Sequence, residues 1–235
     1  MRITLIDAGK RFNRDWIFRH LSYEFTQGHS YAITGPNGSG KSTLLQAIAG
    51  AIGISEGSAC YEAGPAADHH EIPATAGPAH SGGSPGGPSP NQREIPPDQA
   101  YRRLSLAAPY LDLIEEYTVT EFLRFHQSFK PLIPSCSIKY IITRMGLDKA
   151  ANRQIRYYSS GMKQRVKLAQ AIFSDTPVLL LDEPCTNLDA EGTGLYRQLI
   201  KEHAGDRLVV VSSNDVQEYD FCEKTLSILD YKTYR

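Results

Sequence analysis

The chain has 235 residues, of which 41% are hydrophobic and 22% charged, and its formal net charge is -1. This composition is typical of a globular protein, and the balanced charge argues against nucleic acid as the main partner, because phosphate backbones call for a basic face. No apolar run approaches the ~20 residues that cross a bilayer, and Asp7 interrupts the N-terminus where a signal peptide would stay apolar, so we expect a cytoplasmic protein.

The first fifty residues are predicted to form mostly strands. Arg2–Ile6 and Trp16–Phe25 have strand patterns and are separated by a turn at residues 12–15. Ser30–Thr34 is a short apolar strand that runs directly into a glycine-rich loop, and Ser42–Ile52 then has helical spacing. A strand, a glycine-rich loop and a helix in this order are typical of a phosphate-binding site.

From residue 63 to residue 92 the composition changes abruptly to proline, glycine and serine. This segment has too few apolar side chains to offset the entropy of ordering it, so a disordered surface insert is predicted. A tolerated insertion is favoured over a recognition segment. The histidines of the insert (His69, His70 and His80) are too loosely held for a metal site.

Helices and buried strands alternate in the second half of the chain. Helices are predicted over Val119–Phe129, Ile138–Met145 and Met162–Phe173. Val178–Leu181 and Leu208–Val211 are continuous apolar runs that end in polar residues, as strands buried on both faces of a parallel sheet do. This alternation predicts an α/β fold. The cysteines are scattered without a CxxC pair and are predicted to be reduced thiols: Cys60, Cys136, Cys185 and Cys222.

The glycine-rich loop matches the pattern GxxxxGK[ST] in full. Its glycines let successive backbone N–H groups point at phosphate oxygens, Lys41 supplies a cation, and the Ser42 hydroxyl can bind Mg²⁺. The alternative is a glycine-rich turn that precedes Lys-Ser by chance, and the flanking strand and helix argue against it. The predicted nucleotide-binding residues are Gly35, Pro36, Asn37, Gly38, Ser39, Gly40, Lys41, Ser42 and Thr43.

Two carboxylates end the buried run Val178–Leu181. Asp182 and Glu183 are therefore expected at the carboxyl edge of the sheet, where ligands of open α/β sheets bind. We expect Asp182 to hold Mg²⁺, directly or through water, and Glu183 to polarise the attacking water beside the γ-phosphate. Two acids that merely end a strand are the alternative, which the nearby phosphate loop makes less attractive.

A third motif, Tyr158-Ser159-Ser160-Gly161-Met162, precedes a predicted helix. With this motif, the chain resembles the ABC ATPase family in the order of its phosphate loop, LSGGQ-like signature, Asp-Glu strand and Asp-bearing loop. The resemblance covers nearly the whole chain (1–235) as one domain, except the insert. It implies a P-loop NTPase core with a mostly parallel sheet, an N-terminal antiparallel β subdomain and an inserted α-helical signature subdomain at about residues 105–165.

The resemblance also implies roles for single residues. Ser159, Ser160 and Gly161 match the signature, Asp189 matches the loop that crosses the dimer interface, and Phe12 stands where the family has an aromatic stacked on adenine. It further implies ATP and Mg²⁺ as cofactors and a head-to-tail homo- or heterodimer. The expected partner is a membrane-spanning transporter subunit, which would place the protein peripherally on the cytoplasmic face of the inner membrane.

The sequence departs from the family pattern at three places. The signature has Ser160 and Met162 in place of a glycine and a glutamine. Pro109 or Tyr110 stands where the family has a glutamine that touches Mg²⁺ or water. Asn214 replaces the histidine after the last core strand, and because asparagine cannot carry a positive charge, slow basal ATP turnover is predicted.

Three functions are compatible with these residues. The leading one is the ATP-hydrolysing subunit of a transporter, most similar to bacterial export-type ATPases. The second is an ABC ATPase that works without a membrane partner, such as an assembly factor. The third is a regulatory module that binds ATP and barely hydrolyses it, which Asn214 favours and Glu183 opposes.

Overall fold

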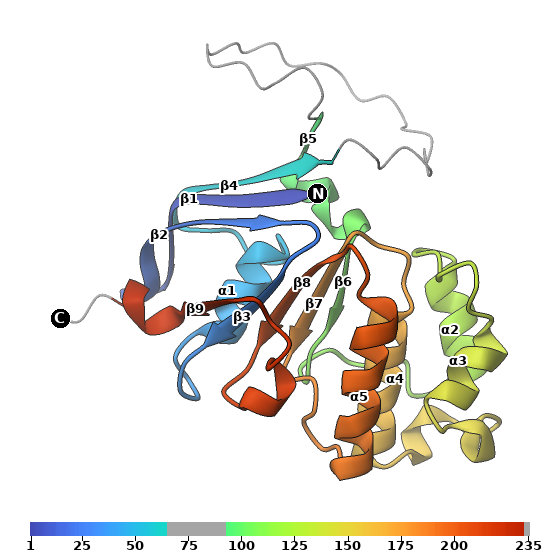
Figure 1. Cartoon of the computed structure of the whole chain (residues 1–235). Coiled ribbons are helices and arrows are strands. Elements are labelled where there is room, and N and C mark those ends of the chain that lie inside the picture. The colour runs from blue at the N-terminus through green and yellow to red at the C-terminus, as the bar shows by residue number, and fades with distance from the viewer. Residues whose placement is uncertain (65–92, 233–235) are drawn as a thin grey trace.

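The fold combines an antiparallel sheet, a parallel sheet and a layer of helices (Figure 1). The structure is a computed structural model and describes residues 1–64 and 93–232. It confirms the predicted α/β class, with a parallel sheet at the centre and an antiparallel sheet built largely from N-terminal residues.

The antiparallel sheet has the strand order β2-β1-β4-β5. Its strands are β1 (Arg2–Phe12), β2 (Asp15–Thr26), β4 (Glu56–Ala63) and β5 (Arg93–Ile95). The first strand is longer than the predicted Arg2–Ile6, because its pairing with β2 shifts register after Leu5 and the apolar alternation is lost there. Asp7 has a φ of 46° and His20 a φ of 58°, so both sides of this irregular stretch leave regular strand geometry.

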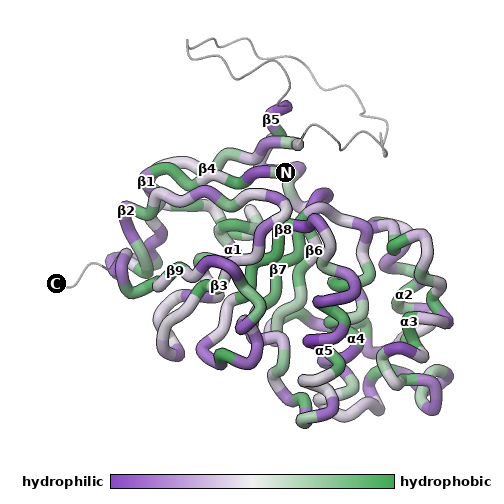
Figure 2. Tube along the Cα trace, in the orientation of Figure 1, coloured by the Kyte–Doolittle hydropathy of each residue, from purple (hydrophilic) through white to green (hydrophobic). Residues whose placement is uncertain are grey.

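The central sheet is parallel throughout and has the order β6-β7-β8-β3-β9. Its strands are β3 (Ser30–Thr34), β6 (Leu104–Ala107), β7 (Val178–Asp182), β8 (Leu208–Ser212) and β9 (Lys224–Ser227). Every residue of β7 and β8 is buried, as the apolar runs predict. Figure 2 shows these strands as a hydrophobic centre between more polar surfaces.

Alternate residues of the central strands belong to two separate cores. Leu179 and Val209 join the core that contains α4 and α5, whereas Leu180 and Val210 join the core beneath the antiparallel sheet. The sheet therefore has helices on one face and α1 with the antiparallel sheet on the other (Figure 1).

The α-helices are α1 (Lys41–Ile48), α2 (Val119–Gln127), α3 (Ile138–Arg144), α4 (Ser160–Ile172) and α5 (Ala190–His203). Short 3₁₀ helices lie at Pro97–Arg103, Asp148–Ala150, Ile155–Tyr157, Val216–Glu218 and Ile228–Tyr231. The predicted helix Ser42–Ile52 ends earlier, because Gly50 turns the chain with a φ of 69°. Within the described ranges, no helix is both long and apolar enough to cross a membrane.

The boundaries of two predicted regions differ from the elements observed. Ala63, the first residue of the predicted insert 63–92, ends β4, and residues 65–92 lie outside the described part of the chain. The helical region predicted at about 105–165 starts inside β6, so its first residues belong to the parallel sheet. All four cysteines are free thiols.

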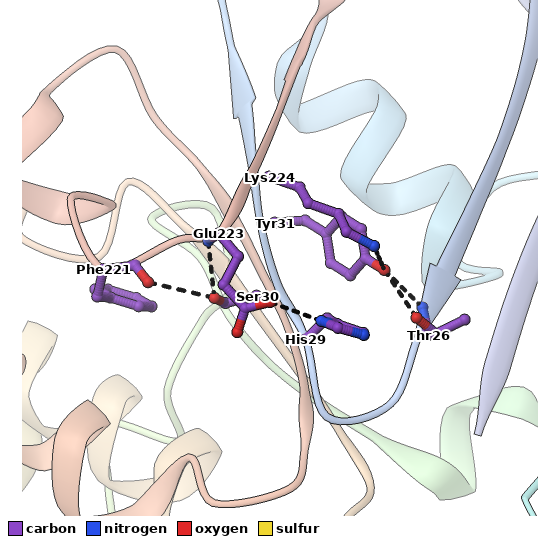
Figure 3. Close-up of polar contacts among 7 residues, drawn as sticks. All are labelled: Thr26, His29, Ser30, Tyr31, Phe221, Glu223 and Lys224. Carbon is purple, nitrogen blue, oxygen red and sulfur yellow. Dashed lines mark hydrogen bonds and ion pairs between the residues drawn. The ribbon is translucent and has the colours of Figure 1, made fainter.

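The outer edge of the central sheet is fastened where β3 begins (Figure 3). His29 Nδ1 lies 2.6 Å from a Glu223 carboxylate oxygen, and the Glu223 amide donates to Ser30 Oγ at 3.1 Å. The Lys224 ammonium lies 5.1 Å from the centre of the Tyr31 ring, whose hydroxyl accepts from the Thr26 amide. These contacts hold β9 against the strand that leads into the glycine-rich loop.

Candidate functional site

The glycine-rich loop lies between β3 and α1, in the predicted setting. Lys41 begins the helix and is only 4% exposed. Its ammonium donates to the carbonyl oxygens of Gly35 at 2.9 Å and Pro36 at 3.2 Å, so its charge points into the curve of the loop. The hydroxyl oxygen of Ser39 is buried without a hydrogen-bond partner among the described residues. The loop thus gathers donors and a cation, as phosphate binding requires.

Two glycines let neighbouring elements press directly on this loop. Gly40 has a φ of 103°, and a Cβ added there would lie 2.3 Å from Ile17 Cγ2 of β2. Gly35 has a φ of 146°, and its added Cβ would lie 2.7 Å from Ile228 Cγ2, just after β9. Glycine is required at both positions by conformation and by space.

Asp182 ends β7 beside the start of α1 and is 1% exposed. Its Oδ1 has no hydrogen-bond partner among the described residues. Burial raises the pKa of this carboxyl, while the hydroxyls of Ser212 and Ser42 act in the opposite direction. A buried carboxylate with an unused oxygen next to a serine hydroxyl suits a hard divalent cation, so the residues present fit Mg²⁺.

Glu183 follows at the carboxyl edge of the sheet with a φ of 42°, which is uncommon for a residue with a side chain. Its amide donates to the Ser212 carbonyl at 2.8 Å, and the Thr186 hydroxyl lies 3.5 Å from its Oε2. The side chain is half-buried at the end of the strand. A sparsely populated backbone conformation persists only where the surrounding structure enforces it. The surroundings of Glu183 therefore fix its backbone and, through the backbone, the direction in which its side chain leaves the chain.

The loop after β8 reaches the phosphate loop through an amide pair. Asn214 Nδ2 donates to Asn37 Oδ1 at 3.0 Å, although the two residues are far apart in sequence. The structure therefore places Asn214 at the glycine-rich loop, where the sequence predicts a γ-phosphate contact.

The signature residues lie at the start of α4 and touch the loop before α5. The Ser159 hydroxyl accepts from the Met162 amide at 3.3 Å as the N-cap of α4. A Cβ on Gly161 would lie 2.9 Å from the Asn187 carbonyl oxygen, which explains the need for a small residue. Asp189 caps α5 through the Gly192 amide.

Ser160 is exposed in the first turn of α4, beside Ser159. Arg165 lies 3.8 Å from the Asp189 carboxylate, so the signature helix and the Asp189 loop form one unit within the chain. Ser42 and Thr43 lie in the first turn of α1.

Two aromatic residues occupy positions that the sequence singled out. Phe12, at the end of β1, is 49% exposed and has the Lys10 ammonium 5.0 Å from its ring centre. Its described ring contacts do not include the glycine-rich loop. Of the pair Pro109 and Tyr110, it is Tyr110 whose hydroxyl interacts with the Gln46 side chain of α1 and with the charge of Asp182. Burial raises the pKa of Tyr110, the Gln46 side chain lowers it, and the charge of Asp182 raises it.

Some residues that hold the site were not predicted. Gln164 of α4 donates to the Pro184 carbonyl at 2.8 Å, and the Glu218 carboxylate accepts from the Cys185 amide at 2.8 Å. Both act on the backbone just after Glu183. Glu218 lies in a polar stretch that resembles a solvated turn, so nothing in its local pattern signals burial.

Comparison with known proteins gives one family. The model of the ABC transporter family matches residues 18–186. An uncharacterized ABC transporter ATP-binding protein of Bacillus subtilis, YybJ, is 25% identical over 229 residues, covering 96% of this chain and 92% of YybJ. The cytochrome c biogenesis ATP-binding export protein CcmA of Agrobacterium fabrum is 28% identical over 216 residues, covering 91% of this chain and 88% of CcmA.

Solved structures show the same fold. The ATP-binding subunit of an ABC transporter aligns with a TM-score of 0.73 at 18% identity, over 97% of this chain and 85% of that one. A bacterial ABC transporter cassette in a dimeric structure aligns with a TM-score of 0.71 at 21% identity, over 99% and 97% of the two chains. With the phosphate loop and the buried Asp-Glu strand end in place, the chain belongs to the ABC transporter family, as one of its ATP-binding ATPases.

Proposed function

We propose that this ATPase powers a separate membrane-spanning transporter subunit through ATP-dependent head-to-tail dimerisation. The observation that carries the proposal is that Lys41 at the start of α1, Asp182 at the end of β7 and Asn214 after β8 converge on the glycine-rich loop. The relatives named as export and transporter ATP-binding proteins support transport, and an export-type system in particular.

The site residues divide the chemistry among them. Lys41 and the loop amides bind the phosphates, and Ser42 with Asp182 would hold Mg²⁺, which neutralises phosphate charge when bound. Glu183 orients the attacking water and accepts its proton at a carboxylate oxygen. Asn214 donates an amide hydrogen to a γ-phosphate oxygen. Phe12 stacks on the adenine through its exposed ring.

The dimer would complete the site from the other subunit. The start of α4, with Ser159, Ser160 and Gly161, offers a hydroxyl and free helix N–H groups to a γ-phosphate held by the partner's loop. Asp189, joined to α4 through Arg165, lies on the same surface unit. ATP then joins two weak anion sites into one, and hydrolysis removes the link.

The membrane partner would dock near Tyr110. A cavity of about 400 Å³ lies between the end of α1 and α2, and Tyr101, Leu111 and Phe129 line it. Tyr101 is 54% exposed and Phe129 is 68% exposed, so the rim offers aromatic surface to a partner. Leu111 lines this cavity, and its neighbour Tyr110 interacts with the charge of Asp182, so a docked partner can sense the nucleotide site through this segment. Docking there keeps the protein at the cytoplasmic face of the membrane.

The central test replaces the proposed base. Glu183→Gln should bind ATP as tightly as the wild type and lose roughly 10²-fold or more of its turnover, because the amide cannot accept the proton. Steady-state phosphate release and fluorescent-ATP titration measure the two effects. Sedimentation with ATP should show a stable dimer for this variant. Wild-type turnover in Glu183→Gln would refute the assignment of the base.

The proposed slow basal turnover is tested at Asn214. Asn214→His restores a side chain that can carry positive charge toward the γ-phosphate, so kcat should rise by up to ~10²-fold, by analogy with one oxyanion donor. Asn214→Ala, which removes the donor, should lower kcat further. Equal kcat values in the wild type and both variants would show that this side chain does not contact the reacting phosphate.

A further inference from the structure

The described part of the chain contains three charged residues that are buried: Lys41, Asp182 and Glu218. Lys41 and Asp182 belong to the nucleotide site. Glu218 is 5% exposed and has no part in the roles assigned above. A carboxylate is costly to bury, so its position requires an explanation.

Glu218 acts on the backbone that follows Glu183. Its Oε1 accepts a hydrogen bond from the Cys185 amide at 2.8 Å. Pro184 has no amide hydrogen, so Cys185 carries the first donor after Glu183 itself. The Glu183 amide already donates to the Ser212 carbonyl at 2.8 Å. The segment 212–218 therefore holds the peptide around Glu183 at both ends.

The hydrogen bonds of the Glu183 and Cys185 amides hold a residue whose backbone conformation is strained. Glu183 has a φ of 42°, a conformation that is unfavourable for a residue with a Cβ and persists where the surroundings enforce it. The same segment contains Asn214, which contacts Asn37. One stretch of chain thus fixes the direction of Glu183 and presents Asn214 to the phosphate loop.

The surroundings of the Glu218 carboxyl favour a role as a hydrogen-bond acceptor over a role that depends on its negative charge. Its Oε2 is buried with no hydrogen-bond partner among the described residues. Burial raises the pKa of Glu218, whereas the Ser213 hydroxyl and the Cys185 amide lower it and the charges of Asp215 and Glu183 raise it. No cation faces it in these contacts.

We propose that Glu218 is a positioning residue for ATP hydrolysis, which holds the strained backbone at Glu183 through the Cys185 amide. The inference rests on the proposed roles of Glu183 and Asn214 and adds a residue that supports both. Glu218 does not touch the nucleotide in this role. It acts by fixing the angle at which the Glu183 carboxylate meets the water.

Three variants separate a hydrogen-bond acceptor from a charge. Glu218→Gln keeps the acceptor oxygen and the length, so kcat should stay within about 3-fold of the wild type. Glu218→Asp keeps the charge but is one methylene shorter, and Glu218→Ala removes both, so each should lower kcat roughly 10-fold or more with the KM for ATP little changed. Loss in Gln with retention in Asp would overturn the proposal, as would an Ala variant with wild-type kcat.

Tyr196→Phe is the matched control for a merely structural effect. The buried Tyr196 hydroxyl donates to the backbone carbonyl of Glu218 at 2.8 Å, so this variant loosens the same residue without touching its carboxylate. We expect a lower melting temperature with kcat within about 3-fold of the wild type. A fall in kcat equal to that of Glu218→Ala would assign the effect to general loosening and reject the positioning role.

The experiment also separates this inference from the proposed function. Wild type and Glu183→Gln report whether Glu183 is the base, whatever Glu218 does. Fluorescent-ATP titration of each Glu218 variant reports whether it folds and binds nucleotide. If Glu218→Ala fails to fold, the comparison of Gln with Asp decides.

Discussion

At the scale of single residues, the shape of the phosphate loop depends on two positions that have no Cβ atom. Gly35 and Gly40 have positive φ values and stand against Ile228 and Ile17, respectively. The two isoleucines come from opposite ends of the chain, so the loop is shaped by contacts as well as by its own flexibility. A sequence motif identifies the two glycines, but it does not identify the isoleucine side chains that leave no space for a Cβ there.

Gly40→Ala should lower ATP affinity by roughly 10-fold or more, because the added Cβ would meet Ile17 at 2.3 Å and the φ of 103° disfavours any side chain by about 1–2 kcal/mol. Fluorescent-ATP titration measures the effect. Gly53→Ala is the control, because its added Cβ would meet no atom within 4 Å and should leave affinity unchanged. Wild-type affinity in Gly40→Ala would show that the loop can shift away from β2 at little cost.

The sequence predicts the position of a motif best when its residues are contiguous. The phosphate loop and the pair Asp182-Glu183 are such motifs, and each lies beside the predicted strand or helix, whereas their chemical roles stay predictions. Arg165 and Glu218 were missed, because each acts on a residue distant in sequence. A lone Arg on a helix or a lone Glu in a polar turn is most often solvated. Only the fold brings Glu218 to the Cys185 amide.

At the scale of elements, helix starts hold much of the candidate site. Ser159 caps α4 and Asp189 caps α5, so these two residues, which have proposed roles across the dimer, also stabilise their own helices. Another capped helix, α2, has a complete capping box between Thr118 and Glu121. Hydrogen bonds from the Thr118 amide and hydroxyl to the carboxylate lower the pKa of Glu121.

Thr118→Ala should destabilise the protein by about 1 kcal/mol, because the first turn of α2 loses its side-chain acceptor. Urea unfolding followed by circular dichroism measures this loss. Thr118→Ser keeps the hydroxyl and should stay close to the wild type. If the Ala and Ser variants were equally stable, the capping box would contribute nothing to the folded state.

Two of the elements that the sequence analysis does not predict, β4 and α5, have weak local patterns. β4 contains Gly57-Ser58-Ala59-Cys60, where small residues hide the strand alternation. α5 has Gly192 and Gly194 in its first turns, and glycine is a poor helix former. Both elements form because of tertiary contacts: β4 pairs with β1, and Tyr196 and Leu199 of α5 pack into the core. β7 and β8 were predicted because strands that are buried on both faces have continuous apolar sequences.

At the scale of the whole molecule, the helical layer is joined to the sheet partly through buried polar groups. His126 at the end of α2 lies 2.8 Å from Ser174 Oγ, and Lys130 donates to the Leu104 carbonyl at 2.7 Å. Burial, together with the charge of Lys130, lowers the pKa of His126 from 6.5 to about 4. The folded protein therefore holds this imidazole neutral where the unfolded chain would protonate it.

The sign of the resulting pH dependence follows from linkage. A depressed histidine pKa contributes stability that is complete above pH 6.5 and is lost as the pH falls toward about 4. Between pH 7 and pH 5 the free energy of unfolding should fall by about 2 kcal/mol from this residue. Urea midpoints at the two pH values measure it in the wild type and in His126→Gln. The variant should lose that part of the pH dependence, and an identical dependence in both proteins would contradict the assignment.

The contact of Ile228 with Gly35 has a consequence for when the phosphate loop can reach its final shape during synthesis. Lys224 follows Tyr31 by 193 residues, so the strand that supports the phosphate loop emerges from the ribosome roughly 10–40 s after the loop itself. During that interval the nascent chain contains the complete phosphate-loop motif but lacks β9 and Ile228, which pack against it. Shaping of the phosphate loop is thus completed late in synthesis, and a chain that ends before β9 carries an intact nucleotide motif without the structure that shapes it.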